Sequence, residues 1–348
     1  MKTRTRPEIE PTVAGSSVMA AGSEPGNGRE IAAAPGDKIS SVSAARTRVH
    51  LTLVIVQLLF ASLAIAGRIV LPHFPAGALV CLRVLGAAAV LFVINAVGGG
   101  SWVRDKGDLL RLAVLGWLGI AANQTLFLYG LRHTTAVNAT ILVTTVPVFT
   151  VFGSVLLGRE PASPLKFAGV ALAALGTVFL IGPDRISLAP AVALGNALIV
   201  LGMICYAAYF IYSKSVVGRY GPITVSFYVM LFAAAGVLPF GISALKDTRV
   251  ADMDVSLWWW VAYIVVFPTI ITYLLNIWAL QRVSSNTVAV YIYLQPLFAA
   301  AIAPLLLNGE GITARAALAG LSICGGMALV LLAERQQHRQ IPLEPVGE

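Results

Sequence analysis

Two arginines stand inside or at the edge of long apolar stretches of this 348-residue chain. Arg83 is the eighth residue of the apolar run 76–97, and Arg68 lies near the end of the run 51–70. A cation among apolar residues is costly and is usually retained for a function. We therefore expect Arg83 to pair with a substrate anion or with structural carbonyls. Arg68 is either a gate residue or a cation whose long side chain reaches the membrane interface.

Uncharged polar side chains gather in four further apolar stretches. Asn138 and Thr145, for example, are seven residues apart and would share one face of a helix. Polar groups at membrane depth turn away from lipid. They either line a cavity or hold neighbouring helices together by hydrogen bonds. The residues that we expect to bind a substrate are Arg83, Asn123, Gln124, Asn138, Thr145, Tyr273, Asn276, Tyr293 and Gln295.

The sixteen acidic residues all lie in tails, loops or helix ends, never at the centre of an apolar stretch. Proton-coupled carriers often relay protons through a buried carboxylate. The pattern therefore favours a facilitator or exchanger, or proton coupling through Glu160 and Glu310. The alternative role for Glu160 is a salt bridge with Arg159 or Lys166. The residues that we expect at gates or in coupling are Arg68, Lys214, Glu160 and Glu310.

An enzyme is the weaker hypothesis, and we expect no cofactor and no metal. The four histidines lie at segment ends or in tails and lack the His-Glu-x-x-His type of spacing that binds zinc. The three cysteines all fall inside apolar runs and form no close pair, which argues against a disulfide framework. These seven residues are His50, His73, His133, His338, Cys81, Cys205 and Cys324.

One pattern occurs twice in the chain, over residues 129–182 and again over 278–332. Each copy holds a proline near the middle of an apolar run, Pro147 and Pro296, followed by a short loop with a glutamate. A proline inside a helix frees the carbonyl four residues earlier and bends the helix. We therefore expect Pro147 and Pro296 to form a pair of hinges or kinks beside a cavity, unless duplication has merely copied a tolerated residue.

Composition places these residues in a membrane protein. The chain is 58% hydrophobic and 11% charged, with a mean hydropathy of +0.84, whereas soluble domains are about 25% charged. The predicted fold is all-α and polytopic, with ten transmembrane helices arranged as two inverted five-helix repeats. The ten apolar runs are 51–70, 76–97, 109–131, 135–157, 165–182, 194–213, 223–245, 257–280, 285–307 and 314–332.

The predicted domains follow from these runs. They are a disordered cytoplasmic tail over 1–48, a first repeat over 49–187, a second repeat over 188–333 and a cytoplasmic tail over 334–348. Because five is an odd number, the second repeat enters the membrane from the opposite side, a construction associated with alternating access.

Lysine and arginine set the expected orientation. Thirteen of them flank the helices on one side and five on the other, and the richer side is normally cytoplasmic. We therefore expect a multi-pass protein of the inner (plasma) membrane with both termini in the cytoplasm. The formal net charge of +8 then reflects cytoplasmic loops near anionic lipid rather than nucleic-acid binding.

The motifs together resemble the EamA-type, ten-helix permeases of the drug/metabolite transporter superfamily. The resemblance covers residues 51–333 and rests on Arg68 and Arg83 and on the twice-repeated small-residue, central-proline and Gly-Glu pattern that includes Pro147 and Pro296. It implies export of small metabolites, such as amino acids or related amphipathic compounds. The alternatives are an uptake permease or exchanger for a sugar or precursor metabolite, and a non-transporting membrane scaffold. The expected partners are a small-molecule substrate and the lipid bilayer, with no nucleic acid and with a homodimer left open.

Overall fold

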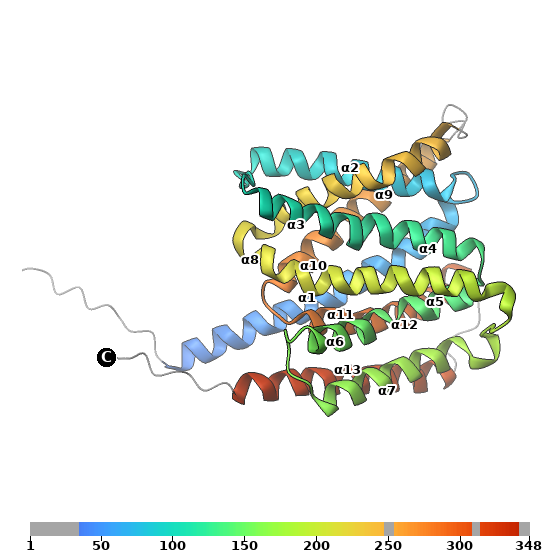
Figure 1. Ribbon diagram of the computed structural model, residues 1–348. Coiled ribbons are helices and arrows are strands. Elements are labelled where there is room, and N and C mark those ends of the chain that lie inside the picture. The colour runs from blue at the N-terminus through green and yellow to red at the C-terminus, as the bar shows by residue number, and fades with distance from the viewer. Residues whose placement is uncertain (1–34, 247–253, 308–313, 341–348) are drawn as a thin grey trace, which may run out of the picture. The chain divides into compact units, whose positions relative to one another are not determined.

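The computed structural model describes residues 35–246, 254–307 and 314–340, and these residues form helices and loops without a strand (Figure 1). This confirms the expected all-α class. The chain divides into two units, Met1–Ala44 and Ala45–Glu348. Of the first unit, the structure describes residues 35–44, which are helical. The site discussed below lies within the second.

The helices before residue 182 correspond to the first five apolar runs. They are α1 (Pro35–Val70), α2 (Ala76–Val97), α3 (Lys106–Gly116), the π-helical segment η1 (Trp117–Ala122), α4 (Asn123–Arg132), α5 (Ala136–Val143), α6 (Val146–Leu156) and α7 (Pro164–Ile181).

The later helices correspond to the remaining runs. They are the short η2 (Pro183–Arg185), α8 (Pro190–Lys246), α9 (Val255–Val265), the π-helical segment η4 (Val266–Ile271), α10 (Thr272–Leu280), α11 (Ser285–Val290), the 3₁₀ segment η5 (Tyr291–Tyr293), α12 (Leu294–Leu307) and α13 (Ala314–Gln340).

Eight helical stretches among the described residues are long and apolar enough to cross a membrane, and Thr47–Leu63 is a shorter apolar helix. One of the eight, Pro190–Ala244, has 55 residues, about 80 Å at 1.5 Å per residue and far more than the ~30 Å hydrocarbon core. The helix is broken at Gly221, whose backbone angles are φ 75° and ψ 167°. A positive φ of this kind is readily adopted only by glycine.

The two helical ends extend further than the sequence pattern indicated. Helix α1 begins at Pro35, so residues 35–48 of the expected disordered tail are helical, and α13 continues to Gln340, beyond the expected boundary at residue 333. Adding residues to an existing helix costs little compared with starting one. A helix therefore continues past the apolar run that specifies it.

Three local structural features recur 149 residues apart, which supports an internal duplication. The π-helical segment η1 has its counterpart in η4. The side chain of Thr135 caps α5, and that of Ser284 caps α11. Run four is interrupted before Pro147, and run nine is interrupted before Pro296.

Helices α7 and α13 lie side by side along one edge of the bundle (Figure 1). Their backbones meet closely, since a Cβ added at Gly169 would lie 2.6 Å from the Gly326 carbonyl oxygen. On α7, Gly169 and Ala173 form this contact. On α13, Gly326 forms the contact, whereas Cys324, two residues earlier, is exposed.

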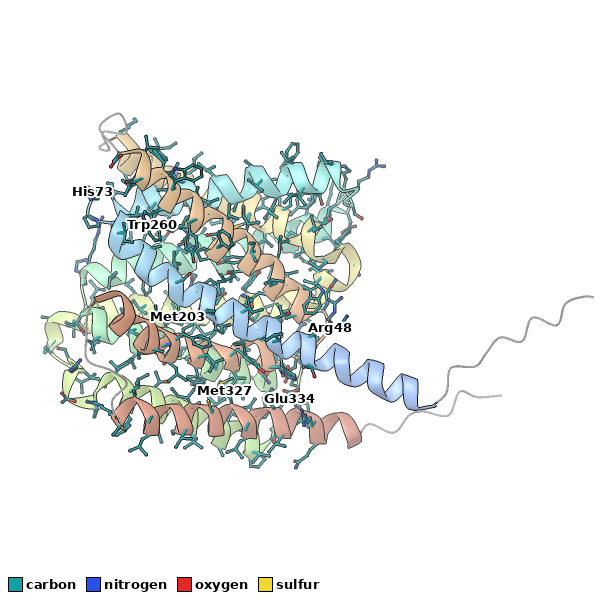
Figure 2. All side chains as sticks on the ribbon, turned by 180° about the vertical axis from the view of Figure 1, so that it is seen from behind. Arg48, His73, Met203, Trp260, Met327 and Glu334 are labelled. Atoms are coloured by element: carbon teal, nitrogen blue, oxygen red, sulfur yellow. The ribbon has the colours of Figure 1, made fainter. Side chains whose placement is uncertain are left out.

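The two ends of the bundle carry different residues. Figure 2 shows His73 and Trp260 toward one end and Arg48 and Glu334 toward the other. We call the first the His73 end. The second includes the α6–α7 loop with Glu160 and is called the Glu160 end.

Candidate functional site

A cavity of about 410 Å³ lies among the helices of the second unit. Its lining extends from Leu71 and Leu131, which adjoin loops at the His73 end, to polar side chains deeper in the bundle. This volume lies within the range of small-molecule pockets, about 300–1,000 Å³. Five of the nine expected substrate-binding residues line it, namely Arg83, Asn123, Gln124, Tyr273 and Gln295.

Arg83 is the cation of this cavity. It lies on α2 and is 8% exposed, and its Nε donates a hydrogen bond of 3.1 Å to Oγ1 of Thr269. None of the ion pairs among the described residues includes Arg83. A buried cation normally has an anionic partner. The guanidinium therefore retains the capacity to pair with an anion that enters the cavity.

The π-helical segment η4 explains how Thr269 reaches Arg83. The Thr269 hydroxyl donates to the carbonyl of Ile264 at 2.8 Å, which leaves its oxygen able to accept from Arg83. Thr272 donates in the same way to Phe267 at 2.9 Å. Both hydroxyls bond carbonyls five residues earlier, the spacing of a π-helix, and single π-turns are frequent at functional sites.

The equivalent segment η1 lies directly before Asn123 and Gln124. Asn123 donates from Nδ2 to the carbonyl of Gly202 on α8 at 2.9 Å. Gly119, inside η1, packs against Tyr209, because an added Cβ there would lie 2.4 Å from the ring. The two π segments thus place polar side chains from both halves of the sequence in one cavity. These π segments were not predicted from the sequence, since a π-turn has no strong residue signature.

Gln295 is held by Gln57, a partner that was not predicted from the sequence. Its Nε2 donates to Oε1 of Gln57 at 2.7 Å, and Gln57 on α1 is 1% exposed. Tyr206 on α8 lines the cavity and stacks on Tyr209, with ring centroids 5.8 Å apart. The signal for Gln57 was present, because it is an uncharged polar residue inside an apolar run.

Four expected substrate-binding residues do not line this cavity. Asn138 lies at the His73 end, where its amide bonds the backbone of Ser187 at 2.7 and 3.0 Å. Thr145 bonds the carbonyl of Leu142 in its own turn. Asn276 and Tyr293 are buried inside the bundle. Asn276 is 1% exposed, and the hydroxyl of the fully buried Tyr293 lies 3.4 Å from the carbonyl oxygen of Val170 on α7.

The paired prolines lie next to the cavity without lining it. Pro147 is the second residue of α6, and Pro296 is the third residue of α12. Each follows a short interruption that accommodates the missing N–H, as expected for proline near a helix start. The residues on either side of each break do line the cavity: Val143 and Val146 in the first repeat, and Ile292 and Gln295 in the second.

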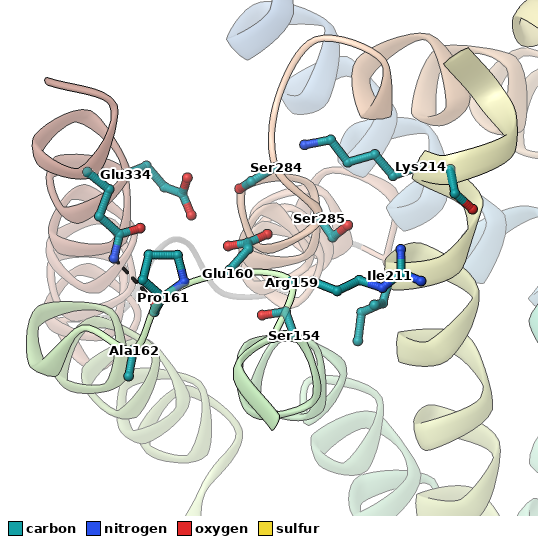
Figure 3. Close-up of a pocket in the computed structure, with 12 residues that line it drawn as sticks. Ser154, Arg159, Glu160, Pro161, Ala162, Ile211, Lys214, Ser284, Ser285 and Glu334 are labelled. Carbon is teal, nitrogen blue, oxygen red and sulfur yellow. Dashed lines mark hydrogen bonds between the residues drawn. The ribbon is translucent and has the colours of Figure 1, made fainter. Parts of the chain in front are cut away.

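A second cavity, of about 710 Å³, lies at the Glu160 end (Figure 3). Glu160, Lys214 and Glu334 line it. Lys166 is fully buried beside it, with its Nζ 3.0 Å from Oε2 of Glu160 and 2.7 Å from Oε1 of Glu334. The alternative role for Glu160, a salt bridge with Lys166, is therefore present, whereas Arg159 lies over the ring of Tyr212 at 4.8 Å.

Asn286 joins Glu160 to the second repeat. Its Nδ2 donates to Oε2 of Glu160, and its Oδ1 accepts a 3.2 Å hydrogen bond from Ser154. Burial, and secondarily the nearby Glu334 carboxylate, raise the pKa of Glu160, while Lys166 partly opposes this rise. Glu334 was missed because it follows the last apolar run. The side chain of Arg68 and the whole of Glu310 lie outside the described residues.

In the part of the chain that the structure describes, no group of three His, Cys, Asp or Glu side chains is placed to hold a metal ion.

Comparison with known proteins is consistent with these features. The model of the EamA-like transporter family matches residues 47–182 and again residues 193–332. An uncharacterized transporter of Archaeoglobus fulgidus is 26% identical over 84% of this chain and 99% of its own length. The uncharacterized inner membrane transporter YicL of Salmonella typhimurium is 25% identical over 75% of this chain and 87% of its own length.

A solved crystal structure of another protein superposes with a TM-score of 0.72. The match covers 84% of this chain and 99% of that protein, at 20% sequence identity. The likeness shows a shared fold. Together with the apolar helices, the family match makes this chain a multi-pass membrane protein and a transporter.

Proposed function

Because the chain belongs to the EamA-like transporter family, we propose that it exports small metabolites carrying an anionic group, such as amino acids or related amphipathic compounds, across the plasma membrane by alternating access. In this proposal the substrate occupies the 410 Å³ cavity. Asn123, Gln124, Tyr273 and Gln295 provide hydrogen-bonding groups around it.

The proposal rests on one observation, which is that Arg83 is buried at the cavity without a paired carboxylate among the described residues. A carboxylate on the substrate would supply the missing counter-charge. Because arginine presents a planar fork of donors, it can hold a carboxylate through two parallel hydrogen bonds.

The proposed architecture is ten transmembrane helices in two inverted five-helix repeats. Helix α8 would supply two crossings, separated at Gly221, and α1 would supply the first. The repeated π segments and the interruptions before Pro147 and Pro296 support the duplication. Five crossings in each repeat would invert the second repeat relative to the first.

The proposed orientation places the Glu160 end in the cytoplasm with both termini. The support is the excess of lysine and arginine at that end. The lining of the substrate cavity runs toward Leu71 and Leu131 at the opposite end. The described structure then corresponds to an outward-facing state.

Transport by membrane vesicles tests this function. Everted and right-side-out vesicles from cells with and without the protein would be offered a panel of labelled amino acids, other small acids and sugars. Export predicts protein-dependent accumulation in everted vesicles. Accumulation only in right-side-out vesicles would instead indicate an uptake permease, and no transport by correctly inserted protein would favour a scaffold.

A further inference from the structure

We infer that Glu160 is a proton-binding site that controls the gate at the Glu160 end: the ionised carboxylate holds the α6–α7 loop against α11, and a proton releases it. The inference rests on the proposed alternating access, because that cycle requires this end to open. Its ligand is a proton from the aqueous phase that reaches the 710 Å³ cavity.

Two carboxylates share one ammonium in this cluster. Among the ion pairs of the described residues, Lys166 is the cation that contacts both, with Nζ 3.0 Å from Oε2 of Glu160 and 2.7 Å from Oε1 of Glu334. The side chain of Lys166 is fully buried, and those of Glu160 and Glu334 are 15% and 11% exposed. Two like charges that share a secluded site disfavour full ionisation, so one carboxyl takes up a proton more readily than an isolated one.

The distances and the burial indicate that Glu160 is the carboxylate that takes the proton. Lys166 is closer to Glu334 than to Glu160, so the Lys166–Glu334 pair can persist as a balanced ion pair when Glu160 is neutral. Burial raises the pKa of Glu160, and the Glu334 carboxylate raises it further. Protonation of Glu160 therefore begins above the ordinary range for glutamate, about 4.3.

Glu160 also links the two halves of the chain through its hydrogen bond to Asn286. Glu160 is in the loop between α6 and α7, whereas Asn286 is the second residue of α11, in the other half of the chain. Ser154 on α6 also bonds Asn286, at 3.2 Å. A charge-assisted hydrogen bond is roughly twice as strong as a neutral one, so protonation weakens the link between the two halves at this end.

The surroundings of Glu160 include groups of both signs. Lys166 on α7 and Lys214 on α8 favour its ionised form, and Glu334 on α13 opposes it. Arg159 is its neighbour in the loop and is held over Tyr212. Figure 3 shows Glu160, Ser284 and Ser285 together at the cavity, with Glu334 on the neighbouring helix and Lys214 on another wall.

Distance measurements between two spin labels test this gate without a transported substrate. Ala162 in the α6–α7 loop and Ser215 on α8 are exposed residues on different walls of the cavity. Ala162→Cys and Ser215→Cys would be labelled in full-length protein with its three native cysteines replaced. Pulsed electron–electron double resonance in liposomes would then give the distribution of distances between the two labels from about pH 8 to about pH 5, a range that lies above the ordinary glutamate pKa.

Because Glu160 is ionised at high pH, we expect the gate to be closed and the distance between the two labels to be short. Acidification should shift this distance to longer values. Glu160→Gln should give the longer distances at every pH. Asn286→Ala, which removes the hydrogen-bond partner and keeps the carboxylate, should also favour the longer distances. Glu334→Gln removes the charge that opposes ionisation of Glu160, so the transition should persist and move to lower pH.

A wild-type distribution that does not change with pH would overturn the inference. So would a Glu160→Gln protein that follows the wild-type pH profile, or a Glu334→Gln protein whose transition moves to higher pH. Vesicle transport decides the proposed function separately, because the spin-label experiment requires no substrate.

Discussion

The crossing of α7 and α13 allows a matched pair of glycine substitutions. Gly325 and Gly326 are neighbours in α13, but their surroundings differ. A Cβ at Gly326 would lie 2.5 Å from the carbonyl oxygen of Gly169 and 2.6 Å from the backbone nitrogen of Ala173. A Cβ at Gly325 would meet only a methyl group of Leu172 within 4 Å, at 3.8 Å.

The magnitude follows from these distances. Ordinary C···O contacts lie at about 3.3–3.6 Å, so Gly326→Ala must move the two helices apart by about 1 Å. Both substitutions gain the same ~0.5–1 kcal/mol of helix preference over glycine, and this gain cancels when they are compared. The remaining difference is the cost of overpacking, about 1–3 kcal/mol. Because the obstructing atoms at Gly326 belong mainly to backbone, we expect the upper part of this range.

The assay is the free energy of unfolding of purified protein, measured by titration with sodium dodecyl sulfate in mixed micelles. Gly326→Ala should be less stable than Gly325→Ala, and Gly325→Ala should equal or exceed the wild type. Equal stability of the two variants would refute the close backbone crossing of α7 and α13.

Two further predictions address orientation and the support of Arg83. Single cysteines introduced at Gly99 and Gln336 should react with a membrane-impermeant maleimide only in everted vesicles or opened cells, because both positions lie at the proposed cytoplasmic end; labelling of both from outside intact cells would reverse the topology. Thr269→Val removes the hydroxyl that accepts from Arg83, and a hydrogen bond to a charged group is worth about 1.5–3 kcal/mol, so substrate affinity should fall by roughly tenfold or more. Thr269→Ser keeps the hydroxyl and should stay near wild type; equal losses for both variants would show that the hydrogen bond does not position Arg83.

The helices and their duplication could be predicted because apolar runs indicate membrane helices and because the proline pattern occurs twice. We expected Pro147 and Pro296 to bend two helices, and in the structure each apolar run is interrupted shortly before its proline. The membrane class also followed from the sequence because it depends on composition, and the family followed because it depends on residues that recur at a fixed spacing. The position of a helix end did not, because α1 and α13 continue past their apolar runs.

The site was predicted in part, for reasons that particular residues illustrate. Arg83 and Gln124 line the 410 Å³ cavity, as expected for polar groups that must avoid lipid. Asn138 has the same chemistry but bonds the backbone of Ser187 instead. Periodicity gives the face of a helix and cannot give the neighbour that this face meets. The register changes at η1 and η4 further altered which side chains share a face.

The cluster at the Glu160 end illustrates a different limit. Lys166 and Glu334 are 168 positions apart, and their contact depends on the antiparallel packing of α7 against α13. Lys166 and Glu334 each lie near the end of an apolar run, a position typical of an ordinary residue at the membrane interface. Only the tertiary fold shows that Lys166 is completely buried.

The pairing of Arg83 with a substrate anion is the central claim, and its most direct test compares two forms of one substrate. Wild-type protein and the variants Arg83→Gln and Arg83→Lys would be assayed in vesicles for transport of a carboxylate substrate and its carboxamide analogue. Arg68→Gln and Lys214→Gln serve as controls, with the amounts of inserted protein matched. Lys214 is exposed, so its interaction with a passing anion is screened and worth about 1 kcal/mol or less.

Loss of a buried charge pair costs about 2–5 kcal/mol, which corresponds to roughly 30-fold or more in transport efficiency. Arg83→Gln should therefore lose most transport of the carboxylate form and much less of the carboxamide. Arg83→Lys should recover only part, because an ammonium cannot form the two parallel hydrogen bonds of a guanidinium. Equal losses for the carboxylate and the carboxamide would contradict the account, and Arg83 would then hold helices together rather than bind the substrate.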